Sequence, residues 1–190
     1  MATTTLDAGR RVFSNLKALL FTPWTDDATL GETTYDLVNI VGDTTSCEQD
    51  DNDVNELAHE FSNEPLLENI NLGKKQFSTE CIDFRNDVLK ALFGYEVDET
   101  GSALAPNTYK ELYCKVEMQF NSTDDIVVLP KVKLNSKAAI ASMKTDAARA
   151  TIAGTCYTAY VTAGTLKGWT DMAFIGKTNA TTYTVAAAES

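Results

Sequence analysis

The sequence predicts a mainly β chain of the α+β class, with antiparallel strands, one prominent helix and one long loop. The clearest observation is the alternation of apolar and polar residues in LYCKVEMQF, residues 112–120, which is typical of a strand with one buried face. A second is FSTECIDFRNDVLKALFG, residues 77–94, where apolar residues recur at helical spacing. The third is the length of 190 residues, which suits a single domain. We expect one domain over 1–190, with 1–33 available as an N-terminal arm.

The first elements are less regular. RRVFSNLKALLFT, residues 10–22, has apolar residues at helical spacing and predicts a short amphipathic helix. After a loop marked by proline, glycine and acids, TYDLVNIV (34–41) and TTSCEQ (44–49) are expected to form strands.

The next segment, QDDNDVNELAHEFSNE, is ambiguous. Val54, Leu57 and Phe61 lie at i, i+3 and i+7 and favour a turn of helix, whereas the acidic start favours an exposed loop. We expect a long loop over about 49–64. PLLENINLGKKQF (65–77) then predicts a strand with a turn near its glycine.

The prominent helix is expected over about 79–93. Ser78 or Thr79 can cap its first amides, and Gly94 suits the left-handed residue that commonly ends a helix. One apolar stripe should pack on a sheet, formed by Ile82, Leu89, Leu92 and Phe93.

Residues 109–135 predict an antiparallel hairpin. Its second strand places Lys131 and Lys133 on one face, and Pro130 marks an edge or a bulge. The opposite, apolar face is expected to carry Ile126, Val128, Val132 and Leu134.

The C-terminal part predicts further strands. We expect 136–149 to be irregular, 150–163 to form one strand, and 171–177 and 181–187 to form a closing pair.

Charge is distributed unevenly. The net charge is −11, and the interval between Lys17 and Lys74 contains 13 acidic residues and no lysine or arginine. An acidic run is typical of a solvated face. Tight binding of nucleic acid is disfavoured, because it needs clustered lysine and arginine.

Motifs for chemistry are absent from the sequence. The single histidine, His59, lies far in sequence from any cysteine within a nucleophile-like turn, and no phosphate-binding glycine motif occurs. A calcium loop started at Asp51 fails, because Glu56 replaces the turn glycine and Ser62 replaces the bidentate glutamate. We expect no enzyme activity, metal or cofactor, with weak calcium binding by the acidic loop left open.

The start MATTTLDAGRR lacks the apolar core of a secretory signal, and no apolar run is long enough to span a bilayer. Four widely spaced cysteines are therefore expected to remain reduced: Cys47, Cys81, Cys114 and Cys156.

Over about 34–163, the order of elements resembles the tail tube (major tail) proteins of tailed bacteriophages. The resemblance includes the segments VVLPKVKL and ATIAGTCYTAY. The residues that carry the glycine turn, strand and helix pattern are Gly73, Phe77, Ile82, Leu89, Leu92, Phe93 and Gly94.

This resemblance implies a β-sandwich or barrel with a helix packed on its outside. It implies hexameric rings that stack into a hollow tail tube, which conducts DNA during ejection without binding it tightly. Further implied partners are tape-measure, tail terminator, and baseplate or sheath proteins. The expected location is the virion tail, assembled in the host bacterial cytoplasm, without membrane insertion.

In such proteins a loop between strands reaches the next ring. We therefore expect the acidic loop to be mobile in the monomer and to become ordered on assembly, meeting lysine or arginine of a neighbour. Its contact residues would be Asp50, Asp51, Asp53, Val54, Leu57 and Phe61.

Three alternatives remain open. They are a tube subunit of a contractile injection or secretion system, another phage head–tail or tail completion protein, and a carbohydrate-binding β-sandwich.

Overall fold

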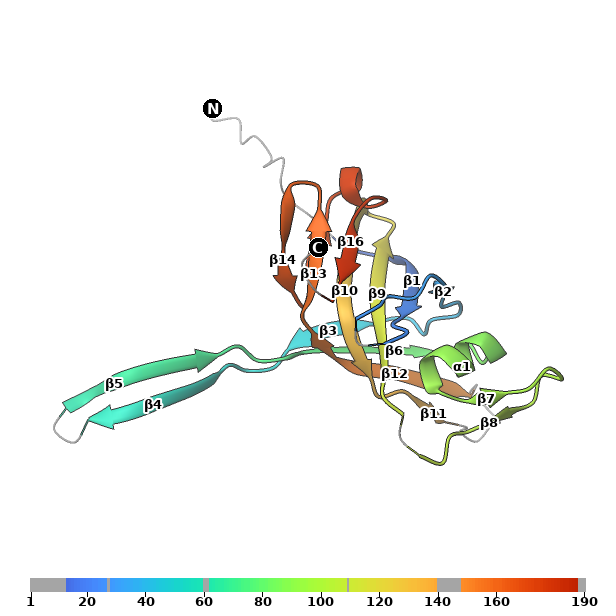
Figure 1. The fold of residues 1–190 in the computed structure, drawn as a ribbon, viewed down its shortest axis with the longest axis horizontal. Coiled ribbons are helices and arrows are strands. Elements are labelled where there is room, and N and C mark those ends of the chain that lie inside the picture. Colours follow the sequence, from blue (N-terminus) through green and yellow to red (C-terminus); the bar gives the residue numbers. More distant parts are fainter. Residues whose placement is uncertain (1–12, 27, 60–61, 109, 140–147, 188–190) are drawn as a thin grey trace.

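The computed structural model describes residues 13–26, 28–59, 62–108, 110–139 and 148–187, with the backbone alone for 53–71 and 138–139. The predicted class is confirmed: the chain is mainly β, and every pairing of described strands is antiparallel. Figure 1 shows a body of sheets with a helix packed beside them, from which a narrow two-stranded hairpin extends.

Nine strands form the main sheet: β1 (Leu16–Pro23), β2 (Tyr35–Asp36), β3 (Ser46–Gln49), β6 (Lys75–Cys81), β9 (Leu112–Phe120), β10 (Thr123–Leu134), β11 (Lys137–Ala139), β12 (Arg149–Tyr157) and β15 (Ala173–Ile175). Their order is β2-β1-β9-β10-β12-β6-β3, with β11 beside β12 and β15 beside β10.

The smaller elements comprise a three-stranded sheet, two hairpins and two helices. The sheet has the order β14-β13-β16 and consists of β13 (Ala159–Ala163), β14 (Leu166–Thr170) and β16 (Thr184–Ala186). The hairpins are β4 (Asp53–His59) with β5 (Ser62–Asn71), and β7 (Glu96–Val97) with β8 (Ala103–Leu104). The helices are α1 (Asn86–Phe93) and the 3₁₀-helix η1 (Lys177–Asn179).

The main sheet curls around one core without closing into a barrel. Phe21 of β1 and Phe77 of β6 contact each other with ring centroids 6.0 Å apart, although β9, β10 and β12 lie between their strands in the sheet order. Leu92 and Phe93 of α1 belong to the same buried cluster. The helix therefore helps to cover the hollow of a strongly curved sheet.

A bulge in β10 changes which alternate side chains of this strand face the main core. The pairing with β9 shifts between Leu129 and Val132, at Pro130, as expected for a residue that cannot donate to a ladder. Before the shift, Ile126 and Val128 pack in a second cluster with strands of the C-terminal half, whereas Val132 belongs to the main core. The prediction of one continuous apolar face was therefore wrong.

The helix is shorter than the sequence predicts. Residues 75–81 form the strand β6, in which Phe77, Thr79 and Cys81 are buried at alternate positions. Ile82 lies in the link before α1 and is 41% exposed, so it is not part of the helix stripe.

The C-terminal end of α1 agrees with the prediction, whereas its start does not. At the start, Arg85 rather than Ser78 or Thr79 precedes the first turn, and no side chain caps the helix there. Gly94 ends it in the left-handed conformation with φ of 72°. Leu89, Leu92 and Phe93 are buried.

Three further predictions need correction. Residues 16–23 of the predicted N-terminal helix form β1, because alternate residues Leu19 and Phe21 are fully buried. The predicted strand 150–163 is two strands in different sheets, β12 and β13, separated at Thr158. The expected closing pair is not a pair, since β15 joins β10 and β16 joins β13.

A buried polar cluster joins β9 to the C-terminal segment. The hydroxyl of Tyr183 donates to Glu117 Oε2 at 2.6 Å, and Lys115 Nζ donates to the Tyr183 oxygen at 2.9 Å. Burial and the Glu117 carboxylate raise the pKa of Tyr183. These bonds attach the segment before β16 to the main sheet.

Candidate assembly interface

The segment predicted as a loop over about 49–64 contains the strand β4 and the first residues of the strand β5. Strands β4 and β5 pair from Asp53–Asn71 to His59–Ser62 and pair with no other described strand. We call residues 53–71 the arm, which extends away from the body in Figure 1. A two-stranded hairpin is at best marginally stable by itself in water.

The arm is joined to the body at a defined root. The amide of Asp50 donates to the carbonyl of Lys74 at 2.9 Å, and the amide of Gly73 donates to Asn52 Oδ1 at 3.1 Å. A Cβ on Gly73 would lie 1.9 Å from the carbonyl oxygen of Asp50. Only glycine allows the two backbone segments of the root to approach this closely. The direction in which the arm leaves the body therefore depends on Gly73.

The predicted contact residues fall on the arm and its root. Asp50 and Asp51 are exposed at the root. For Asp53, Val54, Leu57 and His59 the structure describes the backbone alone, in β4. Phe61 lies outside the described residues.

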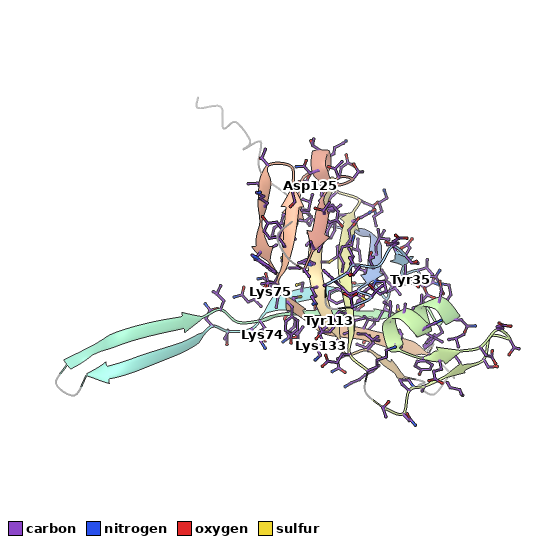
Figure 2. The ribbon with its side chains drawn as sticks, viewed as in Figure 1. Tyr35, Lys74, Lys75, Tyr113, Asp125 and Lys133 are labelled. Carbon is purple, nitrogen blue, oxygen red and sulfur yellow. The ribbon has the colours of Figure 1, made fainter. Side chains whose placement is uncertain are left out.

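A group of lysines and aromatic rings lies on the outer face of the sheet beside this root. We call Trp24, Lys74, Tyr113, Lys131, Lys133 and Tyr157 the lysine–aromatic face. Figure 2 shows Lys74, Tyr113 and Lys133 near the point where the arm joins the body. Trp24 directly follows β1, Lys74 lies at the root, and the other residues lie on β9, β10 and β12. Because they are far apart in the sequence, no local motif could reveal them.

The contacts within this face are close. Lys131 Nζ lies 4.9 Å from the ring centroid of Tyr113 and 5.2 Å from that of Trp24. Lys74 Nζ lies 5.9 Å from the ring of Tyr157, and the rings of Tyr113 and Tyr157 are 6.3 Å apart. Lys133 Nζ lies 5.9 Å from the ring centroid of Tyr113, so three ammonium groups of this face lie over aromatic rings.

Carboxylates border the face. Lys133 forms an ion pair with Glu111, and this lysine lowers the pKa of the Glu111 carboxyl. Lys131 interacts electrostatically with the carboxylate of Asp26.

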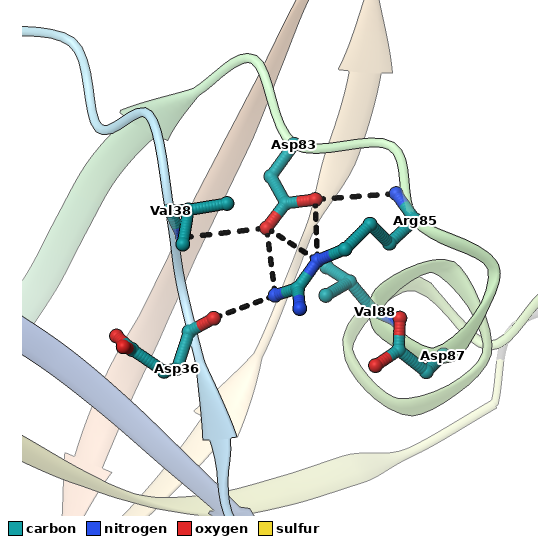
Figure 3. Close-up of polar contacts among 6 residues, drawn as sticks. All are labelled: Asp36, Val38, Asp83, Arg85, Asp87 and Val88. Carbon is teal, nitrogen blue, oxygen red and sulfur yellow. Dashed lines mark hydrogen bonds and ion pairs between the residues drawn. The ribbon is translucent and has the colours of Figure 1, made fainter.

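A buried carboxylate elsewhere has a structural role (Figure 3). Asp83 is 3% exposed and accepts from Arg85 Nε at 3.0 Å and from the amide of Val38 at 3.3 Å. Arg85 Nη2 also donates to the carbonyl of Asp36 at 2.6 Å. The cluster connects the segment after β2 to the start of α1. The Asp83 carboxylate and the Arg85 guanidinium are hydrogen-bonded to each other and to the backbone of that segment.

Two of the four free cysteines contact each other. A hydrogen bond from Cys156 lowers the pKa of Cys47, and this contact together with burial raises the pKa of Cys156. Burial raises the pKa of Cys114 to about 12. Cys81 also has a pKa raised by burial, so three of the thiols are held protonated.

Within the described ranges, no three His, Cys, Asp or Glu side chains converge to hold a metal ion. In the same part of the chain, no helix has the length and apolar character needed to cross a membrane.

Comparisons with known proteins give little similarity. No family model and no curated protein matches the chain. A chain in the cryo-EM structure of the anti-feeding prophage (AFP) baseplate, 6-fold symmetrised, matches over 90% of this chain and 99% of its own length, with 10% identity and a TM-score of 0.44. The function proposed below therefore rests on the geometry and charge of the chain itself.

Proposed function

We propose that this chain is a structural subunit of a tail tube of the bacteriophage type, which forms hexameric rings that stack into a hollow tube. In this role the curled body would form the wall of a ring, and the arm would reach a neighbouring subunit. DNA would pass through the tube during ejection, and tape-measure, terminator, and baseplate or sheath proteins would contact its interior and ends.

The arm is the observation that carries the proposal. It places the backbone groups of β4 and β5 in a separate two-stranded sheet that projects from the body. The cost of ordering such a hairpin is not offset by a local core, because two strands enclose none. An interaction with another subunit supplies the missing burial.

Charge supports passage of DNA rather than its retention. The net charge of −11 disfavours strong attraction to phosphates, and residues 18–73 contain no lysine or arginine. A tube wall without basic clusters toward its channel would let the polymer slide.

Negative-stain microscopy and light scattering of the purified full chain, over increasing concentration, test the proposal. We expect rings about six subunits in size and stacked tubes. A protein that stays monomeric at every concentration, including in kosmotropic salts such as ammonium sulfate, would overturn the proposal.

An arm deletion identifies the element responsible. Joining Asn52 to Leu72 through an Asn-Gly turn removes 53–71 and keeps the bonds of the root. We expect a folded body with an unchanged near-ultraviolet spectrum that no longer forms tubes. Leu166→Ser, which removes an apolar side chain that is 77% exposed on β14, is the control and should assemble normally.

A further inference from the structure

We propose that the lysine–aromatic face is the receptor for the arm of a second copy of this chain. This inference rests on the proposed function, and it specifies which surface of the neighbour the arm contacts.

Charge complementarity favours this occupant. The arm carries Asp53, Glu56, Glu60, Glu64 and Glu68 and no lysine or arginine. The register pairs Glu56 directly with Glu68, and like charges at opposite positions of an antiparallel pair destabilise it. A partner that supplies ammonium groups relieves this repulsion, and the face supplies Lys74, Lys131 and Lys133.

The position of the face gives the contact a direction. Lys74 directly follows Gly73 of the root, so the lysine–aromatic face lies where the chain's own arm joins the body. The arm extends away from this face (Figures 1 and 2). The ten residues of β5 span about 33 Å. The arm of one copy can therefore reach the root of the next.

A contact between two different surfaces is heterologous. Such contacts propagate from copy to copy and produce either closed rings or open stacks. Each copy carries both a lysine–aromatic face and an arm. The same contact can therefore repeat from one copy to the next along an assembly.

The face also has a shape suited to a hairpin. A shallow groove adjoins Lys133, and its lining includes the small side chains of Ser78, Ala153 and Thr155. Gly154 in this groove brings the backbones of β12 and β10 close together, since a Cβ there would lie 2.5 Å from the carbonyl oxygen of Lys133. Small side chains leave room for the backbone of an incoming strand pair.

Zero-length carbodiimide cross-linking of a mixture of unlabelled and ¹⁵N-labelled full chain tests the contact. Mass spectrometry distinguishes links between copies from links within one copy. We expect mixed-isotope links from Glu56, Glu64 or Glu68 to Lys74, Lys131 or Lys133. If tubes form but the arm links to other lysines, or to none, the inference is wrong while the proposed function stands. If no assembly forms, both fail.

Charge reversal provides a second measurement. Lys74→Glu should raise the concentration needed for half-maximal assembly by at least about tenfold, because like charges would meet at the contact. Lys167→Glu is the matched control, since Lys167 is also exposed but lies on β14, and it should change assembly by less than about twofold.

Rescue separates the contact from a loss of folding. Glu56→Lys with Glu68→Lys should block assembly, and mixing this variant with Lys74→Glu should restore it in part. Absence of rescue with both variants folded would overturn the inference. Assembly insensitive to Lys74→Glu, together with loss of single-stranded DNA binding in that variant, would instead assign the face to nucleic acid.

Discussion

Phe21 and Phe77 contact each other edge to face, with an interplanar angle of 66°, across the hollow of a single curled sheet. Both side chains are almost completely buried. The contact joins the β1 end of the sheet to the β6 end, so it holds the curl that the barrel-like body depends on.

Replacing Phe77 with Ala should lower the free energy of unfolding by about 3–5 kcal/mol, because it removes a large buried ring and leaves a cavity. Phe174→Ala is the control, since that ring is 50% exposed, and it should cost much less. Urea denaturation measures both. A double-mutant cycle with Phe21→Ala should give a coupling of about 0.5–1.5 kcal/mol, and a coupling of zero would contradict a direct contact.

Leu89 provides a test of how α1 packs. Leu89→Ala should destabilise the chain by about 2–5 kcal/mol, from lost burial and the cavity that remains. Lys90→Ala, one residue further on the exposed side of the helix, should change stability by less than about 0.5 kcal/mol. Thermal melts that are equal for the two variants would show that the helix is not anchored through Leu89.

Alkaline pH should destabilise the chain through Cys114. The folded-state pKa is about 12 against an ordinary value of 9.0, so the contribution of the buried thiol is fully present below pH 9 and declines as the pH rises from 9 toward 12. At pH 10 the loss is about 1.4 kcal/mol.

Cys114→Ala removes this titration. Urea unfolding at pH 8 and pH 10 should therefore show a smaller alkaline loss for the variant than for the natural chain. Equal losses would mean that the thiol is accessible to water.

The parts of the fold that could be predicted are those with one dominant period. Strand β9 was predictable because its buried residues alternate strictly, and the end of α1 because Gly94 adopts a conformation that other residues rarely adopt. The sequence assigns residues 16–22 and 79–81 to helices, which is wrong, because short segments can satisfy helical and strand periods together.

The candidate interface was predictable only in part. The acidic composition and length of the segment after Gln49 indicated a contact region, but three apolar residues at helical spacing obscured a hairpin that is stabilised by pairing with residues 62–71. The lysine–aromatic face could not be predicted, because its side chains meet only when distant strands become neighbours in the sheet.

Hydrogen exchange of the arm is the most direct measurement of the central claim that the arm orders and holds the assembly. In the monomer we expect the amides of β4 and β5 to exchange much faster than those of β9 and β10, because a free hairpin opens at little cost. In assembled tubes the arm amides should be protected at least about tenfold more, while those of β9 and β10 stay unchanged. Equal protection of the arm in monomer and tube would contradict the account.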